Sequence, residues 1–153
     1  MSDNEEIWLD PGHDDPGRAA AELSDALDMR LEHLDEDAWY VSTDRLSDSD
    51  PVRFWGRVED NVDARFPPQD WPDDYSIFSD FPLVWTVEST REGDTPLIDR
   101  TRVVFDRVAA VLPWRVVLTH GVRDLVATYD PERGVREFPR GTPADGTGRD
   151  LWA

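Results

Sequence analysis

Apolar residues recur every three or four positions in three stretches of the chain, and a proline stands at the start of each stretch. An acid or hydroxyl residue followed by proline is typical of a helix start, because the side chain caps the first turn and proline fits its first position. The spacing therefore predicts three helices, over residues 16–34, 51–66 and 96–112. The pairs that open them are Asp15-Pro16, Asp50-Pro51 and Thr95-Pro96.

Shorter apolar or alternating runs predict strands between and after these helices. They cover residues 38–43, 81–88, 114–120, 124–129 and 134–138. The last three runs are joined by links too short for a crossover helix, so they form an antiparallel meander. We therefore expect an α+β fold with a mixed or antiparallel sheet of about five strands, three helices mainly on one face, and a C-terminal β-meander.

The two ends of the chain differ in composition from its middle. Residues 1–14 are acidic, and residues 139–153 are rich in glycine and proline. We expect a disordered N-terminus over 1–14, a single α+β domain over 15–138 and a flexible tail over 139–153. Seven tryptophans in 153 residues indicate that the domain has a packed core.

Charge is distributed unevenly along the chain. Residues 1–50 carry 16 acids against 3 arginines, whereas residues 91–153 carry ten of each. Lysine is absent and Asp outnumbers Glu by 24 to 10, a composition that also fits a salt-adapted (halophilic) protein. Salt adaptation should spread acid over the whole surface, so the neutral C-terminal part favours a dedicated binding surface. Excess acid disfavours nucleic acid and anionic membrane as partners and favours a basic protein.

No motif identifies a reaction. The absence of cysteine excludes disulfides and thiolate metal sites, and the absence of lysine excludes a Walker-type phosphate loop. His13 fits a loop, His33 the C-terminal end of the first helix, and His120 a turn. We expect no enzyme activity, no cofactor and no metal.

Four arginines of the C-terminal part could instead line a pocket for an anionic ligand. We favour surface pairing with the acids Asp99, Asp106 and Asp124. The four are Arg102, Arg107, Arg115 and Arg123.

An acidic and aromatic stretch, residues 67–82, separates the second helix from the second predicted strand. It is too long and proline-rich for a simple connection. Aromatic side chains beside carboxylates are typical of protein-binding hot spots, although the aromatics could also fold over the core. We predict a partner-binding surface formed by Asp70, Trp71, Asp73, Asp74, Tyr75, Phe78 and Asp80, extended by Asp35, Asp37, Asp44 and Asp48.

These observations favour an acidic protein-binding module of the inhibitor or immunity type. It would block a basic toxin, such as a nuclease, or another nucleic-acid enzyme by charge complementarity. Bacterial immunity proteins and acidic DNA mimics share this size, charge and lack of cysteine; the likeness is one of type, and no motif ties the chain to a particular family.

Two alternatives stay open: a salt-adapted accessory domain without catalytic activity, and a small-ligand-binding domain or enzyme. The chain shows no signal peptide and no membrane span, so we expect a cytoplasmic monomer or homodimer.

Overall fold

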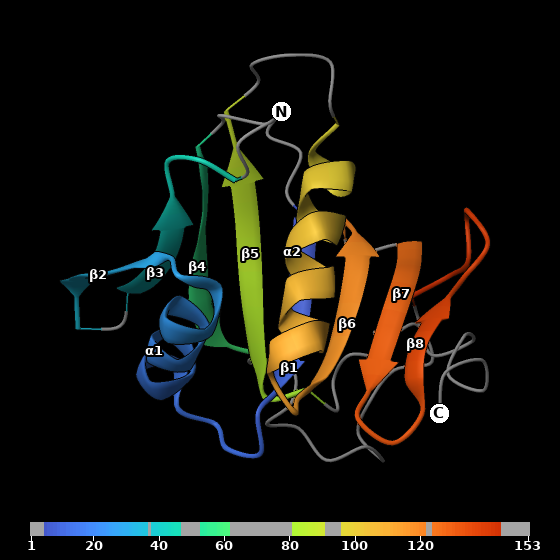
Figure 1. The fold of residues 1–153 in the computed structure, drawn as a ribbon, viewed down its shortest axis with the longest axis horizontal. Coiled ribbons are helices and arrows are strands. Elements are labelled where there is room, and N and C mark those ends of the chain that lie inside the picture. The colour runs from blue at the N-terminus through green and yellow to red at the C-terminus, as the bar shows by residue number, and fades with distance from the viewer. Residues whose placement is uncertain are drawn as a thin grey trace.

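The described residues form a single antiparallel sheet with two helices on one face (Figure 1). The computed structural model describes residues 5–36, 38–46, 53–61, 81–90, 96–121 and 124–144. The helices are α1 (Pro16–Leu27) and α2 (Leu97–Val111). The strands are β1 (Glu5–Asp10), β2 (Arg30–Asp35), β3 (Ala38–Thr43), β4 (Phe54–Asp60), β5 (Leu83–Ser89), β6 (Arg115–His120), β7 (Asp124–Asp130) and β8 (Gly134–Glu137).

The strand order is β2-β3-β4-β5-β1-β6-β7-β8, and every pairing is antiparallel. This confirms the α+β class and the C-terminal meander. The described residues form eight strands and two helices, where we expected five and three. Neither of these helices is long and apolar enough to cross a membrane.

The main core lies between the sheet and the helices. Alternate residues of the central strands face the helices, among them Ile7, Trp85 and Leu118, and each is fully buried. Leu23 of α1 and Phe105 of α2 pack into the same cluster. A smaller cluster lies on the opposite face, which we call the open face because neither described helix packs on it, and its buried members are Trp8, Phe81, Val84, Val117, Leu125 and Ala144.

The first helix begins where the sequence predicts and ends earlier. Asp15 caps it, because its side chain accepts a hydrogen bond of 3.1 Å from the Arg18 amide. The prediction that it reaches residue 34 is wrong. Asp28 adopts a left-handed conformation with φ of 54°, and the chain turns into β2. Leu31 and Leu34 therefore belong to an edge strand and are exposed.

The predicted helix over 51–66 is also wrong, since residues 54–60 form β4. Phe54, Gly56 and Val58 are buried and the residues between them are partly exposed, which is the period of a strand. Gly56 is required there, because a β-carbon would stand 2.5 Å from Trp85 Nε1 and 2.5 Å from the Thr86 carbonyl oxygen. Residues 62–66 lie outside the described residues.

The prediction of a disordered N-terminal segment over residues 1–14 is wrong for the part that the structure describes, which begins at residue 5. Residues 5–10 form β1, a central strand that pairs with β5 on one side and β6 on the other. Ile7 and Leu9 are fully buried. The flexible tail predicted from residue 139 is corrected in part, because Thr142 and Ala144 are buried and Pro143 bridges to Asp124.

Candidate functional site

The predicted binding surface lies mostly outside the described residues. This holds for Asp37, Asp48 and every predicted residue between 70 and 80. The backbone of Asp35 ends β2 opposite Ala38. Asp44 follows the end of β3 and is exposed. Its carboxylate oxygens accept hydrogen bonds of 3.4 Å from the Arg30 guanidinium group.

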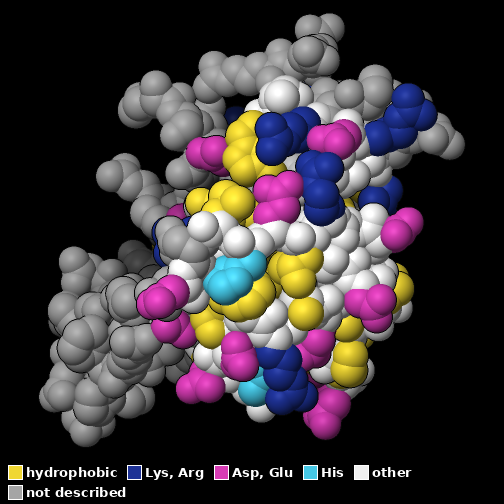
Figure 2. All heavy atoms as spheres, turned by 90° about the vertical axis from the view of Figure 1, so that its left-hand side faces the viewer, with side chains coloured by type: hydrophobic (Ala, Val, Ile, Leu, Met, Phe, Trp, Pro, Cys, Tyr) yellow, Lys and Arg dark blue, Asp and Glu magenta, His cyan; other side chains and the backbone are white. Residues whose placement is uncertain are grey.

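Acidic residues are concentrated at the β2 end of the sheet. Residues 11–36 and 38–46, which build α1, β2 and β3, carry nine acids and three arginines. Residues 96–121 and 124–144, which build α2 and the meander, carry six acids and seven arginines. Figure 2 shows the β2 end, where acidic side chains lie between arginines and hydrophobic side chains. The described residues of this end therefore carry a net negative charge, and in this view their acidic side chains are separated by other side chains.

A cavity of about 190 Å³ lies over β3, β4 and β5, and its side chains belong to the open face. Two aromatic side chains, Tyr40 and Trp55, and two carboxylates, Glu59 and Glu88, line it together with Arg57 and Thr86. Cross-strand pairing aligns these groups: Tyr40 lies opposite Arg57, and Arg57 lies opposite Thr86. We call this cavity the carboxylate–aromatic pocket.

Glu6 of β1 extends the row of the pocket by one strand, because it lies opposite Thr86. Burial, together with the smaller effect of the charges of Glu5 and Glu59, raises the pKa of the Glu6 carboxyl from 4.5 to about 7. Its Oε2 atom is buried and has no hydrogen-bond partner among the described residues. A cation bound nearby would stabilise the ionised form of this carboxyl.

The pocket already engages arginines of its own chain. Arg57 Nε lies 3.6 Å from Glu59 Oε2, and the guanidinium of Arg53 lies 5.2 Å from the Trp55 ring centroid. With Glu6 included, the described residues of the pocket supply three carboxyl groups and one guanidinium group, that of Arg57. Rings and carboxylates in this combination are suited to a guanidinium or ammonium group.

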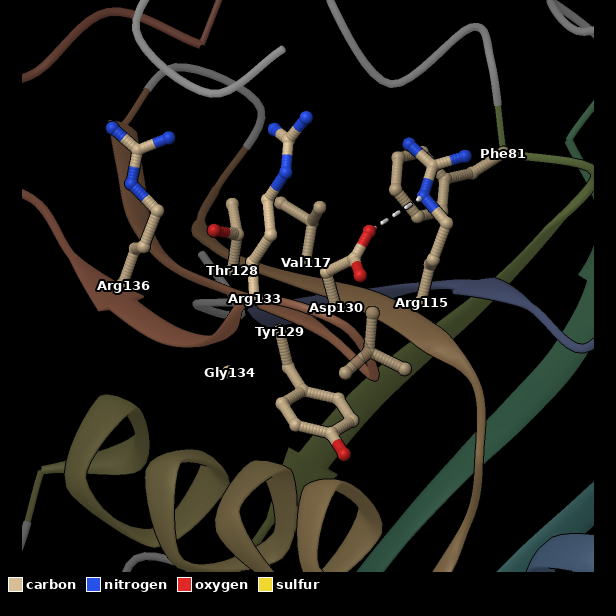
Figure 3. Close-up of a pocket in the computed structure, with 10 residues that line it drawn as sticks. Phe81, Arg115, Val117, Thr128, Tyr129, Asp130, Arg133, Gly134 and Arg136 are labelled. Carbon is tan, nitrogen blue, oxygen red and sulfur yellow. Dashed lines mark ion pairs between the residues drawn. The ribbon is translucent and has the colours of Figure 1, made fainter.

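Arginines dominate the open face at the other end of the sheet. Arg115, Arg133 and Arg136 line a shallow hollow over β6–β8, and their guanidinium groups project to the side opposite α2, whereas Tyr129 points toward the helix (Figure 3). Arg115 forms ion pairs with Asp10 at 3.3 Å and with Asp130 at 3.8 Å. The open face is thus negative over β3–β5 and β1, and positive over β6–β8.

The other C-terminal arginines form mainly internal contacts. Arg102 pairs with Asp106 at 2.9 Å and with Glu137 at 2.7 Å, so its predicted pairing with Asp106 is confirmed. Arg107 donates to the Leu46 carbonyl oxygen at 2.8 Å. Arg123 lies outside the described residues.

The three histidines have separate surroundings. His33 lies in β2 and stacks on Trp39 with 3.7 Å between ring centroids, so its predicted place at a helix end is wrong. His13 lies 2.8 Å from a Glu22 oxygen. His120 ends β6 and lies 2.6 Å from Glu5 Oε1. Within the described residues, no group of three or more potential ligands is placed to hold a metal ion.

Sequence reasoning missed the carboxylate–aromatic pocket because it assigned residues 51–66 to a helix and residues 1–14 to a disordered segment. The signal that could have found it is the alternation in β4, which puts Trp55, Arg57 and Glu59 on one face. Comparison with protein-family models, curated proteins and solved structures found no match.

Proposed function

We propose that this chain is an acidic protein-binding module of the inhibitor or immunity type. Its carboxylate–aromatic pocket receives an arginine or lysine side chain of a basic partner. The observation that carries the proposal is the gathering of Tyr40, Trp55, Glu59 and Glu88 in one pocket, with the partly buried carboxyl of Glu6 in the adjacent strand.

Two kinds of attraction act on a cationic side chain in this pocket. The faces of Tyr40 and Trp55 attract a cation through their quadrupoles. The carboxylates of Glu59 and Glu88 accept charge-assisted hydrogen bonds, which are about twice as strong as neutral ones. Flat aromatic rings also add contact area with little loss of side-chain entropy, which is why they dominate binding hot spots.

The charge distribution supports a basic protein as the partner. The negative end of the sheet would steer a positive surface toward the pocket, and the arginines over β6–β8 would repel it from the other end. Nucleic-acid enzymes expose arginines and lysines that bind phosphate. A carboxylate-lined module that occupied those residues would block such an enzyme.

A direct test is an NMR titration of the full chain with N-acetyl-arginine amide, with N-acetyl-glutamine amide as the neutral probe. We expect the arginine probe to shift the Trp55 indole N–H, and the neutral probe to leave it in place. The double variant Glu59→Gln/Glu88→Gln should abolish the shift. The control variant Asp25→Asn/Glu132→Gln loses the same charge at exposed sites outside the pocket and should retain the shift. Equal shifts with both probes would overturn the proposal.

A second test captures partners from a native lysate, washed at about 0.1 M and then about 0.5 M salt, a range over which exposed charge pairs are screened. We expect one basic protein to be held stoichiometrically by the wild type and the control variant, and lost from the pocket variant. A protein that binds all three variants equally would show that the pocket is not the binding site. Cooperative folding only at molar salt, with no partner, would favour the salt-adapted alternative.

A further inference from the structure

A second and larger cavity, of about 610 Å³, lies between the first turn of α2 and the meander. Its volume falls within the range of about 300–1,000 Å³ that is usual for small-molecule sites. It shares no lining residue with the carboxylate–aromatic pocket, so an inference about it does not depend on the proposed function. Its lining residues are Pro96, Ile98, Asp99, His120, Asp124, Leu125, Val126, Phe138, Arg140 and Gly141.

His120 is the polar group of this cavity that contacts a buried carboxyl group. Its Nδ1 atom lies 2.6 Å from Oε1 of Glu5, a side chain that is only 1% exposed, while the His120 side chain itself is 53% exposed. When Glu5 is ionised its carboxylate can only accept a hydrogen bond, and Nδ1 of His120 is then the donor. In a neutral imidazole, Nε2 is then an acceptor available to a ligand.

A buried carboxylate that fixes the ring of an exposed histidine is a pre-organised arrangement. Glu5 is central in the sheet, because β1 is hydrogen-bonded to both neighbouring strands, so the imidazole is held by a rigid element. The register places Glu5 directly opposite His120 across the β1–β6 ladder. The contact therefore follows from the strand pairing, and a ligand would lose little entropy in ordering the ring.

The rest of the lining determines the class of ligand. Ile98, Val126 and Phe138 supply an apolar wall and are partly exposed. The carboxylates of Asp99 and Asp124 outnumber the single guanidinium of Arg140. From the cavity, its wall and this charge, we propose that it binds a small organic amine, with its apolar body on the wall and its ammonium group toward His120 Nε2 and the two carboxylates.

The test uses three probes with the same ring: 2-phenylethylamine, 2-phenylethanol and phenylacetate. Each is titrated into the full wild-type chain near neutral pH, and amide resonances of Ile98, Val126 and Phe138 are followed by NMR. We expect saturable binding of the amine at least tenfold tighter than binding of the alcohol or the acid, because a hydrogen bond to a charged group is worth about that factor.

Two variants locate the binding site. His120→Gln and Asp124→Asn should each weaken amine binding by about tenfold, and Asp124→Asn leaves the Glu5–His120 contact intact. Glu132→Gln, in the turn before β8, removes an equal charge outside the cavity and should change nothing. The proposal is overturned if phenylacetate or the alcohol binds as tightly as the amine, if no probe saturates while the spectrum stays folded, or if both cavity variants retain wild-type affinity.

Discussion

Trp39 of β3 packs directly against Gly17 of α1. A β-carbon at Gly17 would stand 2.7 Å from Trp39 Cε2, closer than two carbons can approach. The same indole ring stacks in parallel on His33 of the edge strand, with 1° between the planes. Trp39 thus joins the first turn of α1 to the acidic end of the sheet, and the absence of a side chain at residue 17 makes this contact possible.

We expect Gly17→Ala to destabilise the protein by about 1–3 kcal/mol, because the added carbon overpacks the contact with Trp39. Helix propensity alone predicts the opposite, a gain of up to about 1 kcal/mol. Urea unfolding of the variant and the wild type measures the difference. A gain in stability would show that Trp39 does not pack on α1 in solution.

The raised pKa of Glu6 should make stability depend on pH. Below about pH 4.5 both folded and unfolded chains hold the proton, so Glu6 has no effect. Between 4.5 and about 7 the unfolded chain loses the proton while the folded chain keeps it, so this contribution falls as pH rises. Glu6→Gln removes the effect, and we expect it to stabilise the protein by about 1–3 kcal/mol at pH 8, less than the full shift implies because the side chain is partly exposed.

Unfolding of both proteins by urea at pH 4 and pH 8 checks the Glu6 prediction. The variant and the wild type should differ little at pH 4 and clearly at pH 8. The same difference at both pH values would contradict a raised pKa at Glu6.

His120→Ala should cost about 1–3 kcal/mol, because it removes a hydrogen-bonding partner of the buried Glu5 carboxylate. The double variant Glu5→Gln/His120→Ala should recover part of this loss, since a neutral amide costs less to bury than a charge. Denaturation of the wild type, both single variants and the double variant gives the coupling energy. Strict additivity would show that the contact contributes nothing to stability.

Removal of residues 1–10 should abolish cooperative unfolding, because β1 supplies two ladders at the centre of the sheet and buries Ile7 and Leu9. Near-UV circular dichroism and a urea titration check this result. A chain that lacks only residues 1–3 keeps all of β1 and should unfold cooperatively. A cooperative transition in the longer deletion would mean that the sheet closes without β1.

Local signals predicted those elements that depend on local chemistry. Asp15-Pro16 located the start of α1, and the short link and glycine turn of the meander located β6, β7 and β8. The third predicted helix corresponds to α2, although it begins at Leu97 with Pro96 at the N-cap. In each case the determining residues lie within a few positions of one another.

Elements that depend on distant partners were not predicted. In β4, Trp55 and Val58 have helical spacing, and only pairing with β3 and β5 selects the strand. In β1, acids flank the buried Ile7 and Leu9, so the composition of the segment suggested disorder. The carboxylate–aromatic pocket is lined by residues of β3, β4 and β5, and Glu6 of β1 lies beside it. It could not be predicted without β4 and β1, the two strands that the sequence did not indicate.

The central position of β1 has a consequence for synthesis of the chain. Glu5 and His120 are ladder partners separated by 115 positions. Ribosomes add about 5–20 residues per second, so Glu5 of β1 is synthesised roughly 6–23 s before its partner in β6. Throughout that interval the apolar side chains of Ile7 and Leu9 lack the part of their native cover that β6 provides, and exposed apolar segments of this kind are what chaperones bind.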